Sequence, residues 1–219
     1  NNINGSFTTT PASVILMNGA LSHSTITFSN GFINNGLIKM TSATTFYSNL
    51  VVSSGILTNA AGAIIQSDPN PTSTGYHRID GRLDNQGTMN INYNLRLYST
   101  AAGSSNSGIL NISAGKDFIV AAGVWNYDGG TVSTTGRLYF ENATGRFNTA
   151  TMPDIVSYFT GGTLATTLGS VTSAAKIQLA NNNTISAALT LDDTLQIMHQ
   201  SNSVTGAFST TTSAVILMD

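Results

Sequence analysis

Gly31-Phe32-Ile33-Asn34-Asn35-Gly36-Leu37-Ile38 sets the pattern on which the rest of the chain is built. A glycine precedes two apolar residues, a corner that contains asparagine follows, and a second glycine leads into the next apolar stretch. Asparagine tolerates the left-handed backbone region and glycine adopts positive φ freely, so the segment predicts a strand, a corner and a second strand. The same form returns in the ranges 55–64, 81–89, 108–115 and 123–130.

The spacing of these segments favours a solenoid. The first three begin 24 and 26 residues apart, the fourth begins 27 residues later, and the spacing then shortens. Strands of a β-sandwich usually return every 8–12 residues, whereas about two dozen residues suit a coil with two or three strands. We therefore predict one all-β domain over 1–219, a right-handed parallel β-helix of about nine irregular coils and roughly 40–45 Å in length. A β-sandwich is the alternative.

Short segments of period two predict the individual strands. In 89–97, Met, Ile, Tyr and Leu alternate with Asn and Arg, which is the pattern of a half-buried strand. The best helical candidate is 153–159, where Pro and Asp precede an apolar run and two glycines follow. The ranges 67–76 and 100–108 are expected to be loops because proline, glycine and serine interrupt the strand pattern there.

A second, longer repeat links the two ends of the chain. Residues 5–17 read GSFTTTPASVILM and residues 206–218 read GAFSTTTSAVILM, with eight of thirteen positions identical at an offset of 201 residues. We interpret this as a longer period laid over the coil repeat, with the second copy beginning another module. We therefore expect the ends to abut more of the same polypeptide or a neighbouring subunit.

The composition restricts the possible partners. Only 8% of the 219 residues are charged, the net charge is −2 and the eight basic residues are dispersed, which argues against nucleic acid as a partner. The chain has no cysteine, and no apolar run in this segment is long enough to span a membrane. It begins at Asn1 without a signal-peptide pattern, which we interpret as the start of a processed piece or a fragment.

Catalytic motifs are weak. Asp192-Asp193 is the one adjacent acidic pair, but neighbouring strand residues point to opposite faces, so we expect no shared catalytic role and predict that the chain is not an enzyme. His23, His77 and His199 lack the spacing of metal ligands. We expect no cofactor; calcium could bind aspartates at coil corners, although no calcium-loop motif is present.

Four residues are candidates for ligand binding. Trp125 and Tyr127 share one face of a predicted strand, while Tyr76 and His77 follow the proline-rich loop. Exposed aromatic rings could stack on sugars, and a polar cluster beside them could bind sugar hydroxyls. The alternative is that the aromatic residues belong to the core or to a stacked column, and that the polar cluster at 77–80 is a salt-bridged end of the loop.

The phrases FTTTPASVILMNG at 7–19 and LVVSSGILTN at 50–59 resemble the repeats of giant adhesins of the Bacteroidetes. The Gly-and-Asn corners are similar to those of filamentous-haemagglutinin and autotransporter passenger β-helices. The resemblance implies an extracellular or cell-surface protein of bacteria with a structural, adhesive role as a rod or filament, and it implies no catalytic residues. Its expected partners are itself, through end-to-end or lateral association, adjacent modules of the same chain, and surface glycans. A carbohydrate-binding module is the alternative function, and a polysaccharide lyase or hydrolase ranks last.

Overall fold

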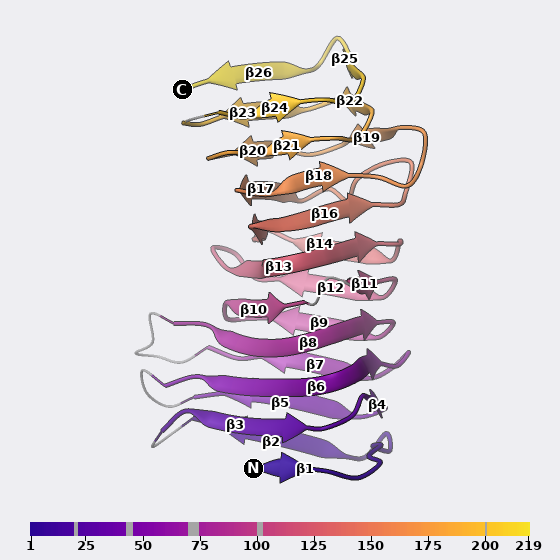
Figure 1. The fold of residues 1–219 in the computed structure, drawn as a ribbon, viewed down its shortest axis with the longest axis vertical. Helices are drawn as coiled ribbons and strands as arrows, with labels where there is room; N and C mark the ends of the chain where they lie inside the picture. Colours follow the sequence, from indigo (N-terminus) through magenta and orange to yellow (C-terminus); the bar gives the residue numbers. More distant parts are fainter. Residues whose placement is uncertain (20–21, 43–45, 70–74, 100–102, 200) are drawn as a thin grey trace.

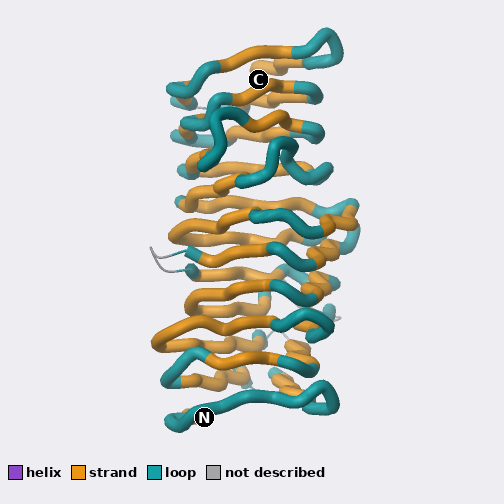
Figure 2. The backbone as a smooth tube through the Cα atoms, turned by 90° about the vertical axis from the view of Figure 1, so that its right-hand side faces the viewer, coloured by secondary structure: helices purple, strands orange, loops and turns teal. Residues whose placement is uncertain are grey.

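The chain folds into a β-solenoid. The computed structural model describes residues 1–19, 22–42, 46–69, 75–99, 103–199 and 201–219. In these residues all regular elements are strands, which pair in parallel and stack as about ten turns (Figure 1). Near strands run rightward, far strands return leftward and each turn lies above the last, so the coil is right-handed. Figure 2 places the two termini at opposite ends of the rod. The predicted fold class is confirmed, with one turn more than the nine expected.

The strands form three columns that run along the rod. The first column contains β1 (Asn2–Ile3), β3 (Ser24–Phe28), β6 (Ser48–Asn59), β8 (His77–Asn85), β10 (Leu95–Tyr98), β13 (Asp117–Tyr127), β15 (Arg137–Glu141), β17 (Val156–Thr160), β20 (Ile177–Leu179), β23 (Thr194–Ile197) and β26 (Val215–Met218). The second column contains β4 (Phe32–Asn34), β11 (Ser104–Asn106), β16 (Ala143–Phe147), β18 (Thr163–Ala165), β21 (Thr184–Ile185) and β24 (Ser203–Val204), joined by the later halves of β6, β8 and β13. The third column contains β2 (Val14–Asn18), β5 (Leu37–Thr41), β7 (Ile64–Ser67), β9 (Thr88–Ile91), β12 (Ile109–Ile112) and β14 (Thr131–Thr134), and then a separate sheet of β19 (Val171–Ser173), β22 (Leu189–Leu191) and β25 (Phe208–Thr210).

Alternation along the strands produces a core that runs the length of the rod. In β8, buried and partly exposed residues alternate from His77 to Asn85, as the period-two pattern requires. One continuous cluster of buried apolar side chains fills the interior. Its largest members are aromatic: Trp125, Phe28, Phe118, Phe140, Phe147 and Phe159.

Buried asparagines form an amide ladder at one corner. Asn34, Asn59, Asn85 and Asn106 lie above one another, and each of the first three donates from Nδ2 to the Oδ1 of the next at 2.7–2.9 Å. The Thr9 hydroxyl donates to Asn34 at the lower end, and Asn106 donates to the Gly129 carbonyl at the upper end. All four asparagines have no exposed surface. Like residues therefore stack on like residues, as the coil repeat predicts.

The coils at the N-terminal end are longer, on the whole, than those at the C-terminal end. Asn34 and Asn59 stack at a separation of 25 residues, and Asn59 and Asn85 at 26. In the upper half, Asn183 and Asn202 stack at 19 residues, and Gln178 and Gln196 at 18. The shorter coils explain why the sequence pattern blurs there and why the chain makes more turns than expected.

Three local expectations have different outcomes. The helical candidate at 153–159 is wrong, because residues from Val156 onward form β17, and Phe159 stacks on Phe140 with ring centroids 4.6 Å apart. The loop expected at 100–108 includes a short strand, β11, over 104–106. Residues 70–74 and 100–102 of the two expected loops lie outside the described residues. No helix suited to crossing a membrane occurs in the described ranges.

Candidate functional site

The structure places two of the four predicted ligand residues in the core. The Trp125 side chain is fully buried and meets the edge of the Phe118 ring, with centroids 5.0 Å apart. Tyr127 is also buried and lies above Asn106, and its hydroxyl donates to the Gly130 carbonyl at 2.9 Å. Neither ring can stack on a sugar from this position. Both residues belong to the core, which was the alternative to ligand binding.

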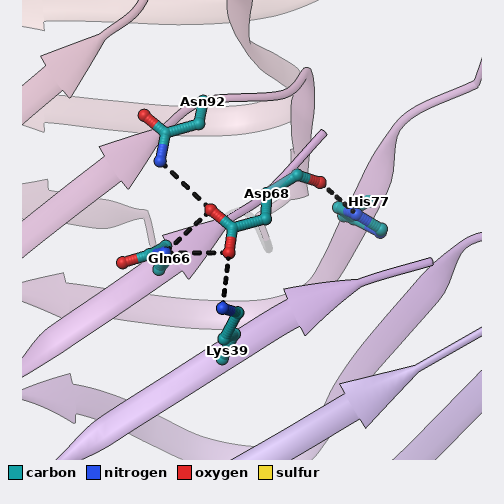
Figure 3. A network of polar contacts seen from close by, with 5 residues as sticks. All are labelled: Lys39, Gln66, Asp68, His77 and Asn92. Atoms are coloured by element: carbon teal, nitrogen blue, oxygen red, sulfur yellow. Dashed lines mark hydrogen bonds and ion pairs between the residues drawn. The ribbon is translucent and has the colours of Figure 1, made fainter. Parts of the chain in front are cut away.

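His77 is buried and belongs to a partly buried polar network (Figure 3). The Ser48 N–H donates to its Nδ1 at 3.0 Å, so the ring proton lies on Nε2, which is 3.2 Å from the Asp68 carbonyl oxygen. Burial lowers the pKa of His77 below its ordinary value, with the Asp68 carbonyl and carboxylate opposing that shift. The imidazole is thus held neutral as a link between the backbone groups of Ser48 and Asp68.

Asp68 ties three coils together beside this histidine. Its carboxylate accepts hydrogen bonds from Asn92 and Gln66 and pairs with the Lys39 ammonium at 2.9 Å. Burial alone would raise the pKa of Asp68, but these hydrogen bonds and the lysine charge outweigh it and lower the pKa. Figure 3 shows the four partners converging on the aspartate from separate strands and turns. The network is satisfied internally, which fits a structural role.

Tyr76 is the one predicted residue that lies at a surface with further aromatic and charged groups. Its ring centroid is 4.9 Å from the Arg96 guanidinium carbon, and the same guanidinium lies 5.0 Å from the Tyr98 ring. Tyr76 therefore borders a cluster on the outer face of the first column, while the other three predicted residues face inward. The structure does not bring the four together.

We call this cluster the tyrosine–arginine patch. Its members are outward side chains of β8 and β10 on one side of β13 and of β15 and β17 on the other: Arg78, Arg96, Tyr98, Arg137, Tyr139 and Tyr158.

Stacking in register positions the side chains of the tyrosine–arginine patch. Arg96 lies directly above Arg78, and Tyr158 lies directly above Tyr139 with its ring edge toward the other ring, centroids 4.8 Å apart. Between these pairs, β13 presents Ile119, and the ion pair of Arg96 with Glu141 crosses over it. The patch thus extends over several coils of the parallel sheet.

Each arginine of the patch has a carboxylate partner. Arg78 pairs with Asp80, Arg96 pairs with Glu141, and Arg137 pairs with Asp117 through two hydrogen bonds of 2.8 and 3.0 Å. The hydrogen bond and charge of Asp117 raise the pKa of Arg137 against the effect of burial.

The guanidinium groups of the patch also lie against its tyrosine rings. The carbon of Arg78 is 4.0 Å from the Tyr98 centroid. Since three arginines face three carboxylates, the charges balance. The patch therefore offers hydrogen-bonding groups and ring faces without net charge.

The acidic pair predicted to play no shared role is divided between two environments. Asp192 accepts hydrogen bonds from the Thr211 and Ser213 hydroxyls, which lower its pKa. Asp193 instead lines a hollow with Asp154 and Lys176. Leu191 points into the core and Asp192 points outward, as strand alternation predicts.

Sequence patterns predict part of the patch. The alternation in 89–97 places Arg96 on the polar face of its strand, and the run from Arg137 to Glu141 alternates in the same way. What no local pattern predicts is which coils are adjacent, so the meeting of Arg96 with Glu141, 45 residues away, emerges only in three dimensions. Among the described residues, no cluster of three or more His, Asp or Glu side chains is arranged to hold a metal ion.

Comparisons with protein-family models, curated proteins and solved structures gave no match to this chain.

Proposed function

We propose that this chain is a non-catalytic structural and adhesive rod of a bacterial extracellular or surface protein. The observation that carries the proposal is the amide ladder. Each buried asparagine has its side-chain groups satisfied by the coil above or below, so a single coil cannot stand alone and the stack is the working unit. A protein whose working unit is a stack of coils is suited to spanning a distance.

The low charge supports the same role. Like charges on successive coils lie roughly 4.8 Å apart and repel, and a rod of 8% charged residues avoids that cost. Where charges do gather, as in the tyrosine–arginine patch, each arginine is matched by a carboxylate. The surface location rests on the resemblance of the corner phrases to adhesin repeats.

The proposal is tested by imaging the isolated chain and by assaying it for turnover. We expect rods roughly 48 Å long, from about ten turns at about 4.8 Å each, and no cleavage of acidic or neutral polysaccharides. Polysaccharide cleavage that Asp192→Asn abolishes and that Asp128→Asn, at another exposed position, leaves intact would overturn the proposal.

A carbohydrate-binding function is the second candidate, and the tyrosine–arginine patch favours it. Tyrosine faces and paired arginine and carboxylate groups suit the C–H faces and hydroxyls of a sugar chain. The balance of charge points to a neutral glycan. The site differs from the one expected from sequence, sharing only its border residue Tyr76.

A glycan array on the wild-type chain and two variants tests this candidate. Tyr139→Ala with Tyr158→Ala removes the paired rings, whereas Gln178→Ala changes the next outward residue of the same column and serves as the control. Retention of one neutral glycan that the double variant loses and the control keeps would support binding at the patch. Equal retention by all three proteins would contradict it.

A further inference from the structure

The tyrosine–arginine patch consists of two clusters of rings that follow one another along the axis of the rod. The lower cluster is formed by β8 and β10 with Tyr76 at its border, and the upper cluster is formed by β15 and β17. Strand β13 lies between the clusters and pairs with β10 on one side and with β15 on the other. From β8 to β17 there are four strand spacings, so the clusters together span roughly 19 Å at about 4.8 Å per spacing.

In the lower cluster, two arginines hold two tyrosine rings at the surface. The Arg78 guanidinium lies against the ring of Tyr98, and the Arg96 guanidinium lies against the rings of Tyr98 and Tyr76. Both rings are partly exposed. Since a cation attracts the face of an aromatic ring at such distances, the arginines hold the rings in place. The lower cluster therefore offers ring surface to a sugar without having to order its side chains first.

The upper cluster repeats this construction. The Arg137 guanidinium carbon is 5.2 Å from the Tyr158 centroid, and the edge of one ring of the Tyr158–Tyr139 pair meets the other ring. Arg137 is itself held by two hydrogen bonds to the Asp117 carboxylate. The rings of Tyr139 and Tyr158 are partly exposed. Each cluster thus has two tyrosine rings held by arginine.

Strand β13 separates the two clusters with apolar outward residues. Ile119 is aligned with Arg96, and Ala122 is aligned with Tyr98. Neither residue carries an aromatic ring or a polar side chain. The ion pair of Arg96 with Glu141 crosses β13 and joins the clusters. The patch therefore has two separate places for a sugar ring, at a spacing that the sheet fixes.

A single ligand reaches both clusters only if it lies along the axis of the rod. β10, β15 and β17 have four or five residues each, so only two or three outward side chains follow one another along a strand. A glycan parallel to the strands would touch the rings of one cluster. A glycan along the axis would pass over both, and the strand spacing of about 4.8 Å is close to the length of one sugar unit.

We propose that the patch binds one linear, neutral glycan along the axis of the rod, with sugar units on both clusters at once. The glycan is neutral because every arginine of the patch has a carboxylate partner. It is linear because the two clusters lie in line on one face. The inference rests on the carbohydrate-binding candidate, and it adds the direction of the glycan, the number of subsites and the length of chain required.

A comparison of short and long oligosaccharides tests the two subsites. The probes are the disaccharide and the hexasaccharide of the neutral glycan that the array retains, beginning with β-1,4-linked and β-1,3-linked glucans. A disaccharide fills one cluster, so calorimetric titration should show two disaccharides per chain. A hexasaccharide spans both clusters, so one should bind per chain, at least about tenfold more tightly, because its two contacts reinforce each other.

Two results of this titration would contradict different claims. Two hexasaccharides per chain, bound no more tightly than the disaccharide, would overturn the axial arrangement and leave the carbohydrate-binding candidate intact. No binding of any neutral glycan on the array or in the titration would overturn both.

Variants of each cluster assign the subsites. Tyr76→Ala with Tyr98→Ala removes the lower rings, and Tyr139→Ala with Tyr158→Ala removes the upper rings. Each double variant should bind one disaccharide and should hold the hexasaccharide no more tightly than the disaccharide. The remaining disaccharide site shows that the variant is folded. Gln178→Ala, the next outward position above Tyr158, is the control and should keep the wild-type values. Wild-type affinity for the hexasaccharide in either double variant would overturn the proposal.

The mass of the complex excludes a bridge between two molecules. A hexasaccharide held by the lower cluster of one chain and the upper cluster of another would also bind tightly. Sedimentation velocity of the protein with excess hexasaccharide should show one chain per complex. A complex of two chains would contradict the binding of one glycan along a single rod.

Discussion

At the scale of the residue, asparagine is suited to a column that repeats itself. Its amide carries both a donor and an acceptor, so a copy of the same side chain directly above it completes the hydrogen bond. Asn59 accepts from Asn34, donates to Asn85 and also donates to the Thr88 carbonyl at 3.2 Å. A serine or aspartate in its place could not make this set of bonds, since neither carries an amide donor.

The central rung of the ladder should be costly to remove. Asn59→Ala leaves the buried Asn85 Oδ1 without its donor, and we expect the free energy of unfolding to fall by about 2–4 kcal/mol. Asn111→Ala removes a similar bond, to Asn90 at 2.8 Å, on the partly exposed outer surface, and should cost less than about 1 kcal/mol. Urea denaturation of both variants measures the difference. Equal losses would show that burial of the ladder contributes little.

The buried His77 should make stability depend on pH. The pKa of His77 in the folded chain lies below the ordinary value of about 6.5. As pH falls through about 6.5, this imidazole therefore binds a proton in the unfolded chain but not in the folded chain. Stability is thus present above about pH 6.5 and declines below it, by up to about 1.4 kcal/mol per pH unit for one proton.

Urea denaturation at pH 7.5 and pH 5.5 tests this prediction. His77→Asn keeps an acceptor for the Ser48 N–H but does not titrate, so its stability should change less between the two pH values. Asp68, whose pKa is lowered from 3.8, keeps its charge across this range and does not contribute. The same loss in both proteins would assign the pH dependence to another group.

At the scale of the element, the corners determine how closely coils approach. Gly87, Gly108 and Gly130 lie in a column two or more residues after a ladder position, and a Cβ on Gly130 would lie 1.9 Å from the Gly108 carbonyl oxygen. Gly130 also has a φ of 86°, which disfavours residues with a Cβ. The Gly-and-Asn phrases of the sequence therefore mark places where one backbone rests on another.

Adding a single methyl group at this column should loosen the stack. Gly108→Ala forces the Gly87 carbonyl away, and we expect a loss of about 1–3 kcal/mol in unfolding free energy. Gly169→Ala, where a Cβ meets nothing within 4 Å, should change stability by less than about 1 kcal/mol. Thermal denaturation of both variants measures the difference. Equal losses would indicate a general preference for glycine in turns, whereas a larger loss in Gly108→Ala would assign the effect to backbone contact between coils.

Many of the corners and strands could be predicted from the sequence, and the segments predicted wrongly have a physical cause. Glycine, asparagine and period-two patterns act locally, so they indicate corners and strands without knowledge of neighbours. The segment 153–159 carries local helix signals, but Phe159 gains more from stacking between Phe140 below and Leu179 above. Long-range packing of this kind has no local signal.

At the scale of the whole molecule, the rod changes character along its length. The lower half has long strands, such as β6 with 12 residues and β8 with 9, and the amide ladder. Above Asn106 the ladder position is occupied by Tyr127 and then Phe147. In the upper half, β20, β21 and β22 have only 3, 2 and 3 residues.

This gradient predicts unequal local stability. Amide hydrogens of β6 and β8 should exchange more slowly than those of β20 to β22, because a short strand is held by fewer hydrogen bonds and opens at a lower free-energy cost. Hydrogen exchange followed by mass spectrometry of the intact chain measures both regions together. Uniform protection along the rod would show that the coils unfold as one cooperative unit.

The fold could be predicted further than the site. Coil spacing indicates a solenoid because successive coils repeat the same arrangement of strand, corner and strand. The predicted site used Trp125 and His77 for their chemistry, but the inward or outward direction of each depends on strand register, which burial shows and composition does not. The tyrosine–arginine patch depends on which coils are adjacent, and that follows from coil lengths that vary between 18 and 29 residues.

The shortening of the coils also gives the rod a mechanical direction. The strand-to-strand hydrogen bonds run along its axis, so tension applied at the two ends peels coils off one at a time. A freed residue spans about 3.4 Å, so a coil of 25 residues near the N-terminal end releases roughly 85 Å, and one of 19 residues near the C-terminal end roughly 65 Å. The sequence of step lengths in an extension trace would thus report from which end the molecule unravels.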